Sequence, residues 1–130
     1  MNNARKHNIG YRHQVFVDLG TLDNLKRDVS AEGLRVMLGV FRQELAERIE
    51  KVDGALSDSD EDTLERQSHC LKSIAGQFGA LPLQKAADKI NELCKRKQYQ
   101  QAFSAGTGIG ELGTGTLLTI DRLIEAMARI

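Results

Sequence analysis

A stripe of apolar residues spaced three and four apart constrains the fold of this chain more than any other feature. The stripe lies within residues 31–56, and its spacing places every member on one face of an α-helix. Ser30 stands where it can cap the start of this helix, and Gly54 with the polar run 57–62 is expected to interrupt it. A helix with one long apolar face has to pack against other elements. The stripe consists of Leu34, Leu38, Phe41, Leu45, Ile49, Val52 and Leu56.

A helix is predicted on each side of this one. Thr21 is expected to cap a short helix that precedes it, with Asp23 placed favourably in the first turn. After the polar run, Ser59 and Asp62 form a variant of the capping box, which predicts the start of another helix. That helix is expected to end at Gly79, because glycine is the usual residue just beyond a helix C-terminus.

Two more helices are predicted downstream. Pro82 suits the first turn of a helix, and the basic stretch 95–97 suits its C-terminal end, where cations favour the helix dipole. The last helix covers residues 116–128, and its start lies anywhere from 107 to 116 because the glycines there weaken helix formation. The whole pattern predicts an all-α chain folded as an antiparallel four-helix bundle with a short extra N-terminal helix.

Length and composition fit a single domain of this kind. The 130 residues suffice for one core, and 28 of them are Leu or Ala, both strong helix formers. Residues 1–16 are expected to form a flexible N-terminal arm, and residues 17–130 the bundle. Cys70 and Cys94 lie in no paired motif, so both are expected to be free and largely buried thiols.

Charge and hydropathy exclude several classes of partner. Eighteen basic and eighteen acidic residues give no net charge, so no long-range field attracts nucleic acid or an anionic membrane. No stretch approaches the roughly 20 apolar residues that span a bilayer, and the first residues contain no apolar leader segment. We therefore expect a cytoplasmic protein, and a monomer, because a bundle buries its apolar stripes internally.

His69 lies on the predicted helix that ends at Gly79. At about 100° per residue, the large apolar residues of this helix fall on one side and His69 on the other. Lys72, Ser73 and Gly76 share the histidine's side. A neutral imidazole offers a nucleophilic nitrogen, and a nearby ammonium would stabilise a phosphoryl group transferred to it. A histidine on a polar helix face is also commonly plain solvated surface, so the geometry alone leaves both interpretations open.

This segment resembles the signature of histidine-containing phosphotransfer (HPt) domains. The likeness extends to the order and lengths of the helices over roughly residues 17–130. Within the family, the serine after the lysine and the Phe-Gly-Ala turn are similar to those of stand-alone phosphorelay proteins of bacterial quorum sensing. The residues that carry the resemblance are His69, Leu71 and Lys72, then Phe78, Gly79 and Ala80, and then Leu83, Ala87 and Ile90.

The resemblance implies a role for the histidine, the lysine and their partners. His69 would be the nucleophile that accepts a phosphoryl group from a receiver-domain aspartate and passes it to another receiver domain. Lys72 would be the charge partner of that phosphoryl group. The chain would be a phosphocarrier without autokinase activity and without a cofactor of its own, the Mg²⁺ being supplied by the partner receiver domain. Its partners would be response-regulator receiver domains and a hybrid sensor histidine kinase.

The resemblance also implies a docking surface around the histidine. Ser73 replaces the usual glycine but is still small enough for a partner to approach. Asn91 occupies a position where many family members carry a Gln or Glu near the histidine, which implies a histidine-orienting role for a shorter side chain. The residues predicted to frame the docking surface are Gln67, Cys70, Ser73, Gly76 and Gln77.

Two other functions stay open at this point. A helical adaptor would bind a receiver domain without phosphotransfer, and acid-labile phosphate on His69 would separate it from a phosphocarrier. A detached phosphotransfer module of a larger histidine kinase is the other alternative. The start at Met1 and the lack of a C-terminal linker favour an independent protein over such a module.

The remaining motifs predict structure rather than chemistry. None of the candidate zinc ligands has the usual paired spacing, so no metal site is expected; the candidates are His7, His13, His69, Cys70 and Cys94. The G-x-G-x-x-G pattern of residues 108–113 follows no predicted strand, so it indicates a loose connection or a close-packing helix face rather than a dinucleotide site. Lys85, Lys89 and the stretch 95–97 form a basic strip, interpreted as a solvated face that could also aid docking.

Overall fold

The computed structural model describes residues 16–128, and every element in this range is helical. The predicted N-terminal arm lies outside the described residues except for Phe16, which packs against the core. The elements are α2 (Leu19–Asp58), α3 (Glu61–Gln77), α4 (Leu81–Lys95), α5 (Tyr99–Ala105), a 3₁₀ turn (Gly106–Gly108) and α6 (Ile109–Ala128).

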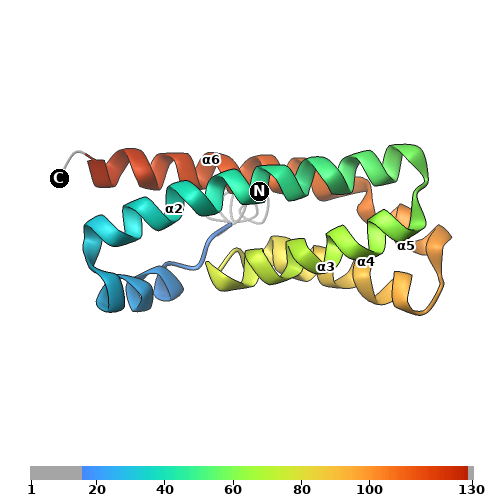
Figure 1. Ribbon diagram of the computed structural model, residues 1–130, viewed down its shortest axis with the longest axis horizontal. Coiled ribbons are helices and arrows are strands. Elements are labelled where there is room, and N and C mark those ends of the chain that lie inside the picture. Colours follow the sequence, from blue (N-terminus) through green and yellow to red (C-terminus); the bar gives the residue numbers. More distant parts are fainter. Residues whose placement is uncertain (1–15, 129–130) are drawn as a thin grey trace, which may run out of the picture.

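Four of these helices, α2, α3, α4 and α6, lie side by side as an elongated bundle (Figure 1). Each runs antiparallel to the one before it, with α2 beside α6 and α3 beside α4. The short helix α5 lies at the end of the bundle where α4 turns towards α6. The predicted all-α fold and the antiparallel four-helix bundle are therefore confirmed.

The predicted short N-terminal helix and the long helix after it together form α2. A bend separates them at Ser30, whose φ of 76° and ψ of 168° are not helical. The Ser30 hydroxyl oxygen accepts a hydrogen bond from the Gly33 N–H at 3.2 Å, so Ser30 caps the long segment as predicted. The short segment, residues 19–29, turns across the end of the bundle (Figure 1).

The predicted cap of that short segment is wrong. Asp18, not Thr21, is its N-cap, because the Asp18 carboxylate accepts hydrogen bonds from the Thr21 N–H at 3.2 Å and from its hydroxyl at 2.9 Å. The Asp18 N–H also donates to the Gly79 carbonyl oxygen at 2.7 Å, which joins this segment to the turn after α3. A carboxylate three residues before the donor is the usual capping geometry.

The boundary between α2 and α3 also differs from the prediction. α2 continues through Gly54 into the polar run, and Ser59 after it adopts a left-handed conformation with φ 54°. The N-cap of α3 is Asp60, whose carboxylate accepts from the Thr63 N–H at 3.1 Å and the Thr63 hydroxyl at 2.6 Å. The capping box expected from Ser59 and Asp62 is therefore wrong, because the turn places Asp60 at the capping position.

The glycine-rich segment before and within α6 lets this helix approach α2 closely. A Cβ on Gly113 would lie 2.8 Å from Ile49 Cδ1, and one on Gly106 would lie 2.6 Å from Leu56 Cδ2. Real Cβ atoms do not approach other atoms so closely, so both α2 side chains occupy space that glycine leaves free. Of the two structures predicted for the G-x-G-x-x-G pattern, a close-packing helix face is observed at Gly113, whereas Gly108 lies in the 3₁₀ turn with open space beside it. α6 begins at Ile109, within the predicted range.

The core agrees with the predicted stripe. Six of its seven members are buried, and Leu56 packs against them while partly exposed. Cys94 is buried, whereas Cys70 is only partly buried, so the prediction that both thiols are largely buried is wrong for Cys70. The buried members are Leu34, Leu38, Phe41, Leu45, Ile49 and Val52.

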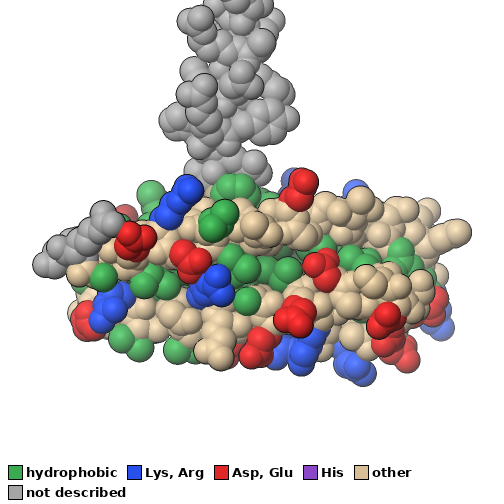
Figure 2. Space-filling view, turned by 90° about the horizontal axis from the view of Figure 1, so that it is seen from above, with side chains coloured by type: hydrophobic (Ala, Val, Ile, Leu, Met, Phe, Trp, Pro, Cys, Tyr) green, Lys and Arg blue, Asp and Glu red, His purple; other side chains and the backbone are tan. Residues whose placement is uncertain are grey.

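The outer face of α2 and α6 carries interspersed charges of both signs, with small groups of hydrophobic side chains between them (Figure 2). Exposed apolar residues of these two helices include Val36, Val40 and Leu118. No described histidine is visible on this face, because His69 belongs to α3 in the other half of the bundle. Among the described helices, none is long and apolar enough to cross a membrane.

Candidate functional site

The rotation of α3 about its axis decides where His69 points. Leu64, Leu71 and Ala75 are completely buried, and Phe78 at the end of the helix stacks on Phe41 of α2 with ring centroids 3.9 Å apart. Apolar packing therefore anchors one face of α3 along its whole length. His69 lies away from that face and is exposed, so the predicted outward orientation is confirmed.

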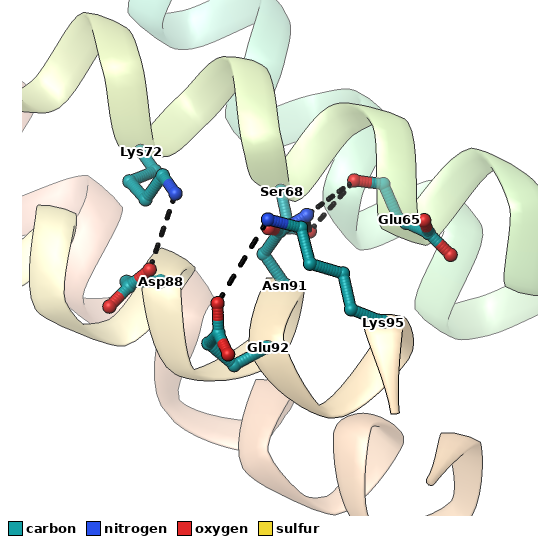
Figure 3. A network of polar contacts seen from close by, with 7 residues as sticks. All are labelled: Glu65, Ser68, Lys72, Asp88, Asn91, Glu92 and Lys95. Atoms are coloured by element: carbon teal, nitrogen blue, oxygen red, sulfur yellow. Dashed lines mark hydrogen bonds and ion pairs between the residues drawn. The ribbon is translucent and has the colours of Figure 1, made fainter. Parts of the chain in front are cut away.

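Lys72 is one turn beyond His69 and points towards α4. Its Nζ lies 3.3 Å from Oδ1 of Asp88, and the Lys72 side chain is only 25% exposed (Figure 3). Lys72 and Asp88 line a shallow hollow between α3 and α4 together with Ser73, Gln84 and Lys85. The lysine predicted as the phosphoryl charge partner is thus held in an ion pair across two helices.

Gly76 lies one turn further along the same side of α3. It is less open than predicted, because a Cβ there would lie 2.5 Å from Nε2 of Gln84 on α4. The Gln84 amide therefore covers the glycine and would have to move aside for any larger residue. Ser73 and Gln77, two of the predicted docking residues, are exposed.

Gln67, one of the predicted docking residues, contacts α2, and Cys70 is another predicted docking residue near the histidine. The Gln67 Oε1 accepts a hydrogen bond from an Arg48 NH group at 3.0 Å, and both Gln67 and Cys70 are partly exposed. Arg48 belongs to the face of α2 beside the predicted stripe, and only the packing of α2 on α3 brings it to this region. The predicted docking residues therefore have neighbours on two helices: Gln67 bonds Arg48 of α2, and Gly76 lies against Gln84 of α4.

Asn91, the predicted histidine-orienting residue, is buried between α3 and α4. Its Nδ2 donates to the Glu65 carbonyl oxygen at 2.9 Å and to the Ser68 hydroxyl oxygen at 3.3 Å (Figure 3). Its Oδ1 has no hydrogen-bond partner among the described residues. The amide therefore binds the turn of α3 that precedes His69, and it makes no hydrogen bond to the imidazole here.

A second shallow hollow lies beside the histidine. His69, Cys70 and Asn91 line it, and so does Lys95 from the end of α4. Lys95 belongs to the predicted basic strip, and its Nζ lies 3.9 Å from Glu92 Oε1. The antiparallel packing of α4 on α3 thus brings one cation of that strip next to His69, which the sequence pattern of α4 alone could not show.

The described residues contain no group of three or more His, Cys, Asp or Glu side chains that could hold a metal ion. His7 and His13, considered as zinc ligands, lie outside the described residues. Burial, with the negative charges of Glu65 and Glu61, raises the pKa of the Cys94 thiol to about 11. This thiol is therefore a protonated core residue rather than a reactive group.

The site is thus an exposed histidine on one helix of a four-helix bundle, with a lysine one turn away and small residues near it. The family model of the Hpt domain matches residues 36–129, and the chain belongs to this family of histidine phosphotransfer domains, which function in phosphorelays. The match spans the long segment of α2 and all later helices.

A solved structure supports the fold independently. Histidine-containing phosphotransfer protein B (HptB) from Pseudomonas aeruginosa PAO1 is similar, with a TM-score of 0.77 and 19% sequence identity. The likeness covers 87% of this chain and 97% of the other. At this identity it shows a shared fold. A comparison with curated protein sequences finds no match.

Proposed function

We propose that this protein is a phosphocarrier in which His69 accepts a phosphoryl group from a receiver-domain aspartate and passes it to the aspartate of another receiver domain. The observation that carries the proposal is the exposure of His69 on the anchored helix α3, with Lys72 one turn away, in a chain of the Hpt family. The His69 ring is open to a partner, whereas the residues that anchor its helix are completely buried.

The transfer itself needs only one group from this chain. An unprotonated ring nitrogen of His69 attacks the phosphorus of an aspartyl phosphate, forming a P–N bond as the P–O bond to the aspartate breaks. The aspartate leaves as a carboxylate, and the proton on the other ring nitrogen stays on the imidazole. Transfer to the next receiver domain is the same exchange in reverse.

The side chains around His69 divide into three further roles. Lys72 would provide positive charge to the phosphoryl oxygens, and the half-buried position of its side chain limits the screening of that charge by water. Partners would dock over the surface framed by Gln67, Cys70, Ser73, Gly76 and Gln77. Asn91 would orient the histidine indirectly, by binding the preceding turn of α3 and so fixing the helix that carries the ring.

The partner would supply the rest of the chemistry. A receiver domain brings the phosphorylated aspartate and the Mg²⁺ that neutralises phosphoryl charge, and a hybrid sensor histidine kinase is proposed as the upstream source. This chain would therefore have no autokinase activity and no cofactor of its own. We also propose that it acts in the cytoplasm as a monomer, because the bundle buries the apolar stripes of its helices internally.

Phosphorylation by phosphoramidate, a small phosphoryl donor, tests the proposal without a known partner. Intact-mass measurement should show one added phosphoryl group that is lost in acid and retained in alkali. His69→Gln should abolish the addition, and His13→Gln, the matched control, should leave it unchanged. A phosphorylated receiver domain with Mg²⁺ should then give the same product on the parent protein.

Two outcomes would contradict the proposal. Phosphate that is stable in acid, or that persists in His69→Gln, would place the modification on another residue. Tight binding of receiver domains with no phosphoryl transfer to His69 would instead support the adaptor function.

A further inference from the structure

The ion pair between Lys72 and Asp88 has a consequence for phosphoryl transfer at His69. The Lys72 ammonium lies 3.3 Å from Oδ1 of Asp88, so it points from α3 towards α4 (Figure 3). Lys72 and His69 also belong to different hollows. Lys72 and Asp88 line one of them, and His69 lines the other. In the unphosphorylated protein, Asp88 therefore pairs with the Lys72 ammonium across the two helices.

A phosphoryl group on His69 would compete with Asp88 for this ammonium. Side chains three residues apart on a helix are neighbours, with Cβ atoms about 5–6 Å apart, and the lysine side chain is flexible enough to turn towards His69. A phosphoryl group carries a charge of about −1.5 to −2 near neutral pH, whereas the Asp88 carboxylate carries a single charge. The phosphoryl group is therefore the stronger partner.

We propose that Asp88 is a positioning residue that binds Lys72 in the resting state and releases it to the phosphoryl group when His69 is phosphorylated. The inference rests on the proposed function of His69. Asp88 lowers the stability of phospho-His69 in two ways: Lys72 must leave a carboxylate to reach the phosphoryl group, and the freed carboxylate then stands near a second negative charge. A carrier that passes its phosphoryl group on benefits from this limit on its own stability.

The lifetime of phospho-His69 tests the proposal directly. The parent, Asp88→Asn and Asp88→Glu proteins are phosphorylated with phosphoramidate, separated from the donor, and followed by phosphorus NMR as the phosphohistidine decays. Asp88→Asn should lengthen the lifetime about two- to fivefold, the range that corresponds to a partly exposed ion pair. Asp88→Glu retains the carboxylate and should behave like the parent.

Two further variants separate a role through Lys72 from a general charge effect. In the Lys72→Ala background, adding Asp88→Asn should change the lifetime much less than it does in the parent. Glu92→Gln is the matched control, since it removes the same charge from the next turn of α4, where the carboxylate pairs with Lys95 instead. Glu92→Gln should leave the lifetime of phospho-His69 close to that of the parent.

Each contrary result has a distinct meaning. An unchanged lifetime in Asp88→Asn would overturn the proposal, as would an equal change in the Lys72→Ala background or an equal change from Glu92→Gln. If the parent carries no phosphoryl group on His69 at all, the proposed function fails, and the role of Asp88 fails with it.

Discussion

The side-chain amide of Asn91 donates a hydrogen bond to the backbone carbonyl oxygen of Glu65, 2.9 Å away across the interface of α4 and α3. The Asn91 side chain is 1% exposed, and its Nδ2 also reaches the hydroxyl oxygen of Ser68 at 3.3 Å. These bonds hold α4 against the turn of α3 that immediately precedes His69. A buried polar contact therefore joins the two helices next to His69, in addition to the apolar packing.

Replacement of Asn91 by Ala should destabilise the protein by about 1–3 kcal/mol, because it removes buried hydrogen bonds and leaves a small void. Urea denaturation followed by circular dichroism measures the change. Glu92→Ala, at the partly exposed neighbouring position, is the control and should cost less than about 0.5 kcal/mol. Equal stability of Asn91→Ala and the parent would show that the amide does not hold the two helices together.

His69→Gln should leave the stability of the bundle within about 0.5 kcal/mol of the parent, because the side chain is exposed and makes no buried contact. The same variant should accept no phosphoryl group from phosphoramidate. Thermal melting and intact-mass measurement on one preparation check both expectations. A large fall in melting temperature would mean that the imidazole contributes to the core, contrary to its exposure.

The fold could be predicted because its signal is local and periodic. The stripe from Leu34 to Val52 is buried as its spacing indicates, and Pro82 lies in the first turn of α4. Caps were harder to predict, because several neighbouring polar residues can each accept the same N–H. Asp60 succeeds over Ser59 because the turn leaves Ser59 with φ 54°, and neighbouring residues alone do not reveal that turn.

The short helix α5 and the start of α6 depend on contacts distant in sequence. α5 has only seven residues, so its apolar positions, Tyr99, Ala102 and Phe103, are too few to predict a helix from their spacing. α6 contains glycines that disfavour a helix, and Ile49 of α2 fills the space beside one of them, Gly113. The stability of the start of α6 therefore comes from packing on another helix, and a local sequence pattern does not predict it.

The candidate site also contains features that the sequence predicted and features that it could not predict. The exposure of His69 and its neighbourhood to Lys72 follow from helical spacing within α3, so the sequence was sufficient for both. Asp88 and Lys95 belong to α4, and their approach to α3 depends on the register between two antiparallel helices. Helical periodicity within a single segment carries no information about that register.

Gly113→Ala should destabilise the protein by about 1–2 kcal/mol, because a new Cβ would lie 2.8 Å from Ile49 Cδ1 and overpacking outweighs the gain in helix propensity. Gly54→Ala is the matched control on α2. No atom lies within 4 Å of a Cβ there, so it should stabilise by about 0.5–1 kcal/mol. Denaturation midpoints of the two variants should shift in opposite directions. Shifts of the same sign would mean that α6 does not pack on Ile49 as described.

Lys72→Ala should slow phosphoryl transfer or shorten the lifetime of phospho-His69 about tenfold or more, since the loss of one charge-assisted hydrogen bond costs about 1.5–3 kcal/mol. Lys72→Arg should retain most of the activity because it retains the charge. The difference between parent and Lys72→Ala should narrow as salt is raised, to the extent that solvent ions reach the site. Identical rates and lifetimes at low salt would exclude the electrostatic role.

Stability should fall in alkali through the buried thiol of Cys94. Burial and the negative charges of Glu65 and Glu61 raise the pKa of Cys94 to about 11 in the folded protein. The unfolded chain ionises the same thiol at its ordinary pKa of about 8.5. Between these two values the folded state binds the proton more tightly, so the free energy of unfolding decreases as the pH rises from about 8.5 to 11 and is unaffected by this thiol below that window.

Urea denaturation at pH 7.5, 9 and 10 measures this decrease, and Cys94→Ala is the variant that isolates the thiol. The variant should be less stable than the parent at neutral pH, because it loses a packed side chain. Its stability should then fall less steeply between pH 9 and 10 than that of the parent. Cys70→Ala is the control for a general effect of thiol removal, and its slope should match the parent's. A Cys94→Ala slope equal to the parent's would assign the alkaline loss of stability to other groups.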